Sequence, residues 1–294
     1  MAPPIGGTMS TMRFLSIQSS VSYGHVGNSA AVFPLQRIGV EVMPVYTVCF
    51  SNHTGYGAWR GPMLRGSDIR DIVTGIEERG GLAGVDAVLS GYQGGNDIGD
   101  AILDAVAAVK RHSPDAIYAC DPVLGNARSG CFVAPEVQNL IRDRVVGRAD
   151  LITPNQFELG FVTDTTPRDL DSTLDAVDKA FSIGPSTVLV TSVELPENGE
   201  ERLSMIAARA DEAWLITTPR LPMKYNGSGD VTAALFTAHL LGTGSLSEAL
   251  ERTTSSVFGM LERTLAAGTR ELQLIAAQDS FAAPALQFRA ERIR

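Results

Sequence analysis

The chain has 294 residues, with 24 Lys and Arg against 33 Asp and Glu, so its formal net charge is −9. This acidic balance argues against nucleic acid as the main partner, because a phosphate backbone requires a basic surface. No stretch reaches the roughly 18 apolar residues of a membrane span, so no membrane partner is expected. Residues 1–11 lack the basic and apolar regions of a signal peptide, which predicts a disordered extension on a cytoplasmic protein.

Short apolar runs alternate with amphipathic segments along most of the chain. The runs are bounded by polar or breaking residues, as in buried strands, and cover 14–17, 42–50, 85–89, 116–120, 151–152 and 188–190. Helical spacing of apolar residues occupies 67–79, 100–110 and 170–181. This order predicts βαβ units in an α/β fold with a mostly parallel sheet. An antiparallel edge pair is expected at 203–208 and 213–217, followed by helices at 231–241 and 246–265, all within one domain spanning 12–294.

Small, polar or acidic residues follow almost every predicted strand. In an open α/β sheet, ligands bind beyond the carboxyl ends of the strands. We therefore expect these residues to converge on one crevice: Ser19, Ser90, Gly91, Tyr92, Asp121, Asn155, Thr191 and Ser192.

The sharpest motif is the glycine-rich segment at 226–234 (NGSGDVTAA), which runs directly into an apolar helix. Glycines allow the backbone to approach an anion closely, and the helix start behind them offers unpaired N–H groups. Gly227, Ser228 and Gly229 therefore predict an anion hole suited to a phosphoryl group. Asp230 is the only carboxylate next to that hole in the sequence, and it is a candidate general base for an attacking hydroxyl.

Two further segments carry oxygen ligands. In residues 153–158 (TPNQFE), Asn155 and Glu158 lie one helical turn apart, an arrangement that suits either a water-mediated Mg²⁺ site or a simple helix cap. Asp121 ends a predicted strand, where it could support metal or phosphate or merely form a turn.

Two loops follow the first two strands, at 19–29 (SSVSYGHVGNS) and 50–57 (FSNHTGYG). The first contains only Gly24 and Gly27 of a dinucleotide-binding pattern, so a Rossmann fingerprint is rejected. The phosphate-binding loop of P-loop enzymes is absent from the sequence as well. Asn28 or Ser29 is expected to cap the following helix.

Taken together, these segments resemble the pyridoxal kinases of the ribokinase-like superfamily, from about residue 12 to the C-terminus. The resemblance implies a three-layer α/β/α sandwich and ATP-dependent phosphorylation of the 5′-hydroxymethyl group of pyridoxal, in vitamin B6 salvage. It implies Asp230 as the base, and vitamin contacts from Ser19, Thr54, Gly55 and Tyr92. It also implies Mg²⁺ near Asp121 and Glu158, and ATP contacts from Asp121, Thr153, Asn155, Glu158, Thr191, Ser192 and Ser228. A homodimer is the expected assembly.

Several alternatives remain open at the level of sequence. Pyridoxine and pyridoxamine are further candidate acceptors, and a requirement for a monovalent cation is left undecided. A second reading is a kinase of hydroxymethylpyrimidine. A third, of a different class, is a non-catalytic vitamin B6-binding or delivery protein on a kinase scaffold. The intact segment 227–230 argues against that third reading, because a pure binder needs neither a base nor an anion hole.

Overall fold

The computed structural model describes residues 11–294, which form one nine-stranded sheet and a separate two-stranded hairpin. In spatial order, the strands of the sheet are β11 (Glu291–Arg292), β10 (Glu212–Pro219), β9 (Arg202–Arg209), β8 (Thr187–Val193), β7 (Leu151–Ile152), β4 (Ile117–Cys120), β3 (Ala87–Ser90), β1 (Arg13–Tyr23) and β2 (Glu41–Asn52). All neighbours from β2 to β8 are parallel, whereas β9, β10 and β11 are antiparallel. The predicted mostly parallel sheet with an antiparallel end is confirmed.

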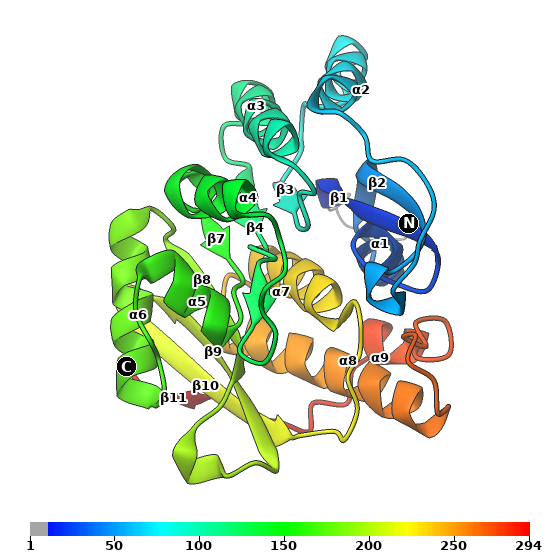
Figure 1. The fold of residues 1–294 in the computed structure, drawn as a ribbon. Helices are drawn as coiled ribbons and strands as arrows, with labels where there is room; N and C mark the ends of the chain where they lie inside the picture. Colours follow the sequence, from blue (N-terminus) through cyan, green and yellow to red (C-terminus); the bar gives the residue numbers. More distant parts are fainter. Residues whose placement is uncertain (1–10) are drawn as a thin grey trace, which may run out of the picture.

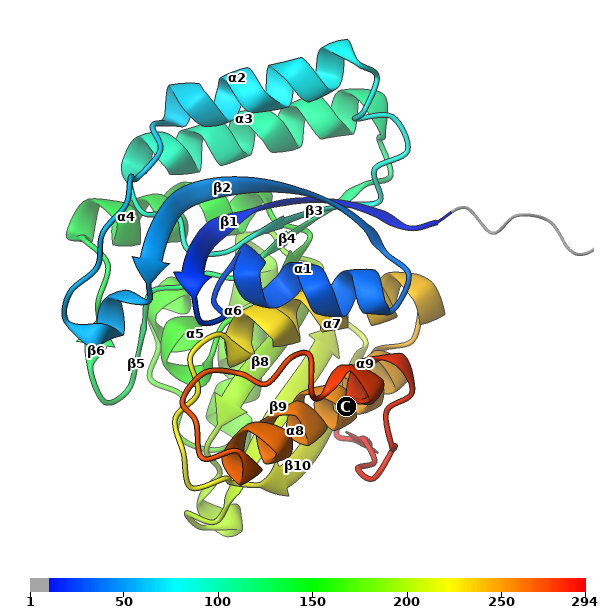
Figure 2. The same cartoon turned by 90° about the vertical axis from the view of Figure 1, so that its right-hand side faces the viewer.

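Helices cover both faces of this sheet, as Figures 1 and 2 show. One face packs against α2 (Gly66–Glu78), α3 (Asn96–His112), α4 (Pro135–Leu140), α5 (Gln156–Thr163) and α6 (Leu170–Ile183). The other face packs against α1 (Asn28–Arg37), α7 (Ser228–Thr243) and α8 (Leu246–Ala266), with α9 (Gln278–Ala282) beside α8. The three-layer α/β/α sandwich is therefore confirmed.

Short elements complete the chain. The hairpin consists of β5 (Gly125–Asn126) and β6 (Gly130–Cys131), and it projects beyond the carboxyl end of β4. The short helices are η1 (Thr54–Tyr56), η2 (Ile141–Val145), η3 (Val146–Arg148) and η4 (Pro196–Asn198).

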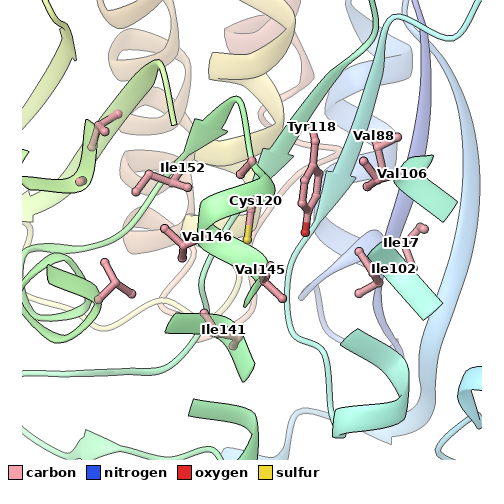
Figure 3. Close-up of a cluster of buried hydrophobic side chains, with 14 of the residues drawn as sticks. Ile17, Val88, Ile102, Val106, Tyr118, Cys120, Ile141, Val145, Val146 and Ile152 are labelled. Carbon is pink, nitrogen blue, oxygen red and sulfur yellow. The ribbon is translucent and has the colours of Figure 1, made fainter. Parts of the chain in front are cut away.

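The core is apolar on both faces of the central strands because each strand alternates its side chains between two helix layers. Figure 3 shows one side of this core, where Ile17, Val88 and Ile152 from three strands meet side chains of α3 and η2. Tyr118 of β4 is fully buried here, and its hydroxyl lies 2.8 Å from that of Ser90. Ser90 is thus part of the core, and its expected place in the crevice is wrong.

Two local predictions are corrected at the first strand and helix. β1 does not end before Ser19 but runs on to Tyr23, with an irregularity in its pairing with β2 between Gln18 and Ser20. Neither Asn28 nor Ser29 caps α1, because Gly27 occupies the N-cap position. The Asn28 side chain instead bonds to Ser16 and to the backbone of β2, which ties α1 to the sheet.

The extension predicted for residues 1–11 lies outside the described residues, apart from Thr11, and stays a prediction. Within the part of the chain that is described, no helix has both the length and the apolar character needed to cross a bilayer.

Candidate active site

A single cleft of about 1840 Å³ opens beyond the carboxyl ends of the parallel strands. It contains most of the residues that the sequence singled out: Ser19, Thr54, Gly55, Tyr92, Asp121, Thr153, Asn155, Glu158, Thr191, Ser192, Gly227, Gly229 and Asp230. Residues from seven separate segments thus meet at one edge of the sheet, as parallel strands require.

The start of α7 lies in the middle of this cleft. Gly227 is the N-cap residue, with φ of 85°, and a side chain there would overlap the carbonyl oxygen of His25. Glycine is therefore required both by the left-handed backbone and by the close approach of the β1–α1 turn. The first N–H groups of α7 have no partner inside the helix, so they can donate to an anion in the cleft.

Asp230 lies in the first turn of α7 and lines the cleft. Burial raises the pKa of its carboxyl to about 6, although the backbone N–H of Gly27 favours the ionised form. A carboxyl with this pKa is mostly ionised at neutral pH and still binds a proton more tightly than an exposed aspartate. It has the properties of a general base.

Asp230 is not the only carboxylate at the helix start. Asp121, which follows β4, is buried, and a Cβ atom built on Gly229 would lie 3.8 Å from its Oδ2. Burial and the charges of Glu158 and Asp230 raise the pKa of Asp121 well above its ordinary value. The sequence places only Asp230 next to the glycine-rich segment. The fold brings Asp121 to the same helix start, although it lies 109 residues earlier in the chain.

Glu158 and Asn155 form a capping box at the start of α5. Glu158 Oε1 accepts hydrogen bonds from the backbone N–H groups of Leu124 (2.8 Å) and Gly125 (3.1 Å), and its Oε2 accepts one from Asn155 (2.9 Å). Burial nevertheless raises the pKa of Glu158 to about 7. Glu158 therefore joins α5 to the chain that leads into the β5–β6 hairpin, and the capping interpretation of this motif is confirmed.

The end of the cleft at β1, β2 and β3 is lined by apolar and aromatic side chains. Val21, Val26, Val48 and Phe50 form a small buried cluster against which Tyr92 packs. Ser19 lines the same region and is 7% exposed. Thr54 and Gly55 belong to η1, at the exposed rim. This end suits a flat, mostly apolar ring with a few polar substituents.

The opposite end, at β7 and β8, carries the polar residues Thr153, Asn155, Thr191 and Ser192 beside apolar side chains of α5 and β9, and we call it the polar end. Thr191 pairs with Asn155 in an isolated parallel bridge, and its N–H donates to the carbonyl of Pro154. Ser192 follows with φ of 52°, where the pairing of β8 with β9 shifts register. The hydroxyl of Thr153 is buried beside Asp121, where it favours the ionised form of that carboxyl and lowers its pKa, although it makes no well-oriented hydrogen bond among residues 11–294.

Besides Ser90, two expected site residues lie outside the lining of the cleft. Gly91 packs against the side chain of the buried Gln18. Ser228 begins α7, and its hydroxyl lies 3.5 Å from the carbonyl oxygen of Tyr225. Ser228 therefore lies at the helix start, and its side chain is not among those that line the cleft.

Five basic side chains also line the cleft, and the sequence motifs did not reveal them: Arg128, Arg142, Arg220, Lys224 and Arg270. Arg220 pairs with Glu194 and Arg142 with Asp143. Among residues 11–294, Arg128 and Lys224 form no ion pair. Burial and the nearby charge of Arg128 lower the pKa of Lys224. Local positive charge is thus available in an acidic protein.

Curated relatives match this chain over nearly its whole length. The pyridoxal kinase PdxY of Leifsonia xyli subsp. xyli is 63% identical, with 96% of this chain and 100% of that protein covered. The pyridoxal kinase PdxY of Corynebacterium diphtheriae is 56% identical at the same coverage. This chain belongs to the pyridoxal kinase family. A family described as phosphomethylpyrimidine kinase also matches, over residues 95–274.

Solved pyridoxal kinases share the fold just described. The pyridoxal kinase of Leishmania donovani in complex with ADP has a TM-score of 0.90 and 27% identity, covering 96% of this chain and 99% of that one. A second structure of that pyridoxal kinase, with ADP and pyridoxamine, has a TM-score of 0.89 at the same identity and coverage. The pyridoxal kinase of Trypanosoma brucei has a TM-score of 0.86 and 28% identity, covering 97% and 100% of the two chains.

Proposed function

We propose that this enzyme transfers the γ-phosphoryl group of ATP to the 5′-hydroxymethyl group of pyridoxal, giving pyridoxal 5′-phosphate and ADP. The observation that carries the proposal is the start of α7, where Asp230 stands beside unpaired helix N–H groups between an apolar and a polar end of one cleft. Phosphoryl transfer requires mainly positioning, charge neutralisation and a proton acceptor, and this arrangement supplies all three.

In this proposal Asp230 accepts the proton of the acceptor hydroxyl as the new bond to phosphorus forms. The transferring phosphoryl group lies against the N–H groups that follow Gly227, where the helix dipole favours negative charge. Ser19, Thr54, Gly55 and Tyr92 hold the vitamin ring at the apolar end. Thr153, Asn155, Thr191 and Ser192 face the nucleotide at the polar end, and Ser228 contributes its backbone to the anion hole.

Arg128 and Lys224 provide part of the positive field of the cleft. Their side chains carry like charges on the cleft wall, so each would be stabilised by a phosphate group between them. We assign them to the phosphates of ATP. This pair explains how a chain of net charge −9 can hold a polyanion.

The residues also fit Mg²⁺, which prefers oxygen ligands and is usually held by one or two carboxylates plus substrate phosphates. Asp121 is a buried carboxylate without an ion pair in residues 11–294, and the hydroxyl of Thr153 lies beside it. Glu158 already accepts three backbone hydrogen bonds, so it would act through water or by holding the loop beside the ion. Bound Mg²⁺ would neutralise charge on the phosphates during transfer.

The test is product formation with purified protein, Mg²⁺ and ATP, with pyridoxal, pyridoxine, pyridoxamine and hydroxymethylpyrimidine offered separately. We expect ADP and pyridoxal 5′-phosphate to appear in equal amounts with pyridoxal. The match to the phosphomethylpyrimidine kinase family favours hydroxymethylpyrimidine as the second candidate substrate. A higher kcat/KM with hydroxymethylpyrimidine than with pyridoxal would overturn the proposal, and absence of ADP with all four would favour a binding protein.

The homodimer stays a prediction of the family resemblance, the cytoplasmic location stays a prediction from the sequence, and the requirement for a monovalent cation stays undecided. The exposed aromatic and apolar side chains Tyr46, Trp59, Met63 and Ile72 on β2, the following loop and α2 offer a surface for a second copy. Sedimentation of the purified protein would test this assembly.

A further inference from the structure

A second, smaller cavity lies behind the vitamin end of the cleft, between the β1–α1 turn, η1 and residues 269–273. Glu271 is the acidic side chain in its lining, and its carboxylate bonds to both of the facing segments. Oε1 accepts a hydrogen bond of 2.7 Å from the hydroxyl of Tyr56, and Oε2 accepts one of 3.0 Å from the backbone N–H of His25. One carboxylate thus joins segments that are 215 and 246 positions away in the sequence.

The bond to His25 leads directly to the proposed anion hole. The carbonyl oxygen of His25 is the atom that a side chain at Gly227 would overlap, so this peptide lies against the start of α7. A side chain at Gly24, where φ is +90°, would overlap Oε2 of Glu271. The turn is therefore packed between Glu271 on one side and the N-cap of α7 on the other. The distance between this turn and the N-terminus of α7 therefore depends on the position of the Glu271 carboxylate.

The bond to Tyr56 leads to the vitamin end of the cleft. Tyr56 is the last residue of η1, directly after Thr54 and Gly55, which line the cleft. The hydrogen bond to Glu271 raises the pKa of Tyr56 to about 12, so its hydroxyl stays a donor throughout the range in which the enzyme would work. Tyr56 is 44% exposed. Besides this hydrogen bond, its ring contacts the ring of Tyr23 edge-on and the guanidinium of Arg270.

The backbone of Glu271 is fixed by buried neighbours and hydrogen bonds. Leu272 and Leu274 are each 1% exposed and pack in a cluster with α7 and α8. The carbonyl oxygen of Glu271 accepts a hydrogen bond of 2.8 Å from Thr269, and the backbone N–H of Gln273 donates to Thr264 of α8. The carboxylate therefore projects from a segment anchored in the core toward two loops whose residues line the cleft.

We infer that Glu271 is a positioning residue for phosphoryl transfer: its carboxylate sets the distance between the vitamin-binding loop at Thr54–Tyr56 and the anion hole at the start of α7. The inference rests on the proposed function, because it assigns the two loops to the vitamin and the phosphoryl group. Errors of about 1 Å in such distances can cost about 100-fold in rate.

The experiment compares Glu271→Ala, Glu271→Gln, Tyr56→Phe and the double variant Glu271→Ala/Tyr56→Phe with wild type, measuring kcat and the KM values for pyridoxal and ATP. Tyr56→Phe removes only the bond to the vitamin loop, so we expect the pyridoxal KM to rise about 5-fold with kcat within about 2-fold of wild type. Glu271→Ala frees both loops, so we expect kcat to fall about 10-fold or more and the pyridoxal KM to rise, with the ATP KM nearly unchanged. Glu271→Gln should lie between these two.

The double variant tests whether Tyr56 acts through Glu271. With the carboxylate gone, the Tyr56 hydroxyl has lost its partner, so adding Tyr56→Phe should change neither kcat nor KM further. Matched controls are Glu262→Gln, an exposed carboxylate of α8, and Tyr23→Phe, an exposed ring in edge contact with Tyr56. Both controls should retain wild-type kinetics.

If wild type phosphorylates pyridoxal and folded Glu271→Ala retains its kcat and pyridoxal KM, the positioning role is wrong. The same holds if the pyridoxal and ATP KM values rise equally, or if the two single effects simply add. Tm values of all variants identify any unfolding. If Glu271→Ala is unstable, the positioning role is tested by Tyr56→Phe alone, through a rise in the pyridoxal KM without a rise in the ATP KM. Failure of wild type to phosphorylate pyridoxal would instead overturn the proposed function.

Discussion

Asp230 differs from the other carboxylates of the cleft in how its charge is compensated. Glu158 is bound by three backbone N–H groups, and Asp121 is surrounded by like charge. Asp230 is stabilised by only two backbone N–H groups, that of Gly27 and its own, and burial raises the pKa of its carboxyl to about 6, so it is mostly ionised at neutral pH and can accept a proton. This difference is why we assign the base to Asp230 and the support of phosphate or metal to Asp121.

The assignment predicts how the rate depends on pH. Protonated Asp230 cannot accept the substrate proton, so kcat/KM for pyridoxal should fall about 10-fold per pH unit below about 6. The measurement is the pH profile of kcat/KM between about pH 4.5 and 8, a range that brackets the pKa of Asp230. Glu158, with a pKa of about 7, also changes charge nearby. Glu158→Gln should therefore keep the acidic fall, and a profile that becomes flat in that variant would contradict the assignment to Asp230.

The position of a site residue can be predicted from the sequence where it depends only on the spacing of neighbouring residues. The spacing of Asn155 and Glu158 placed both on one helical turn, as observed. The targets of Glu158 at Leu124 and Gly125 could not be predicted, because they depend on how α5 packs beside the β5–β6 hairpin. Glu271, Arg128 and Lys224 carry no motif at all. Only their position in the folded chain brings them to the cleft or to the cavity behind it.

Elements with strong periodicity were predicted well. The helix expected at 170–181 is α6 (Leu170–Ile183), and the one expected at 246–265 is α8 (Leu246–Ala266). β1 was predicted too short because its polar residues at 18–20 look like a strand end. Gln18 instead donates to Ser16 of the same strand, and Ser20 bonds to Ser29 of α1. β11, a two-residue strand beside β10, has no signal in the sequence, because it forms only by pairing with an existing edge.

The start of α7 provides a prediction at the scale of an element. Gly227 and Gly244 are the two ends of this helix, and both have left-handed backbones, with φ of 85° and 69°. A side chain at Gly227 would overlap His25, whereas one at Gly244 would meet nothing within 4 Å. Each Ala substitution should cost about 1–2 kcal/mol of stability from the backbone alone.

Only Gly227→Ala should also disturb the anion hole, so we expect its kcat to fall about 100-fold while Gly244→Ala keeps its activity. Denaturant unfolding measures the first effect and steady-state kinetics the second. Equal activity in the two folded variants would contradict the role given to the start of α7.

The order of strands arranges the cleft of the whole molecule. β2, β1 and β3 carry the apolar end, β4 in the centre carries Asp121, and β7 and β8 carry the polar end. The sequence predicted that polar residues would meet at the carboxyl edge, but not their order along it, because strand order depends on crossovers over the sheet. In the proposed function, that order separates the vitamin from the nucleotide and leaves the start of α7 between them.

In the proposed reaction, this cleft transfers a phosphoryl group to pyridoxal with Asp230 as the base. The most direct test of this proposal is kcat of Asp230→Asn with pyridoxal and saturating ATP. Asparagine keeps the size and hydrogen-bonding shape of aspartate, so the variant should fold and bind ATP normally, as checked by its Tm and by the Kd for ATP. A positioned base contributes about 10²–10⁴-fold, and we predict that kcat falls by that amount. A folded, ATP-binding variant whose kcat stays within a few-fold of wild type would contradict the account.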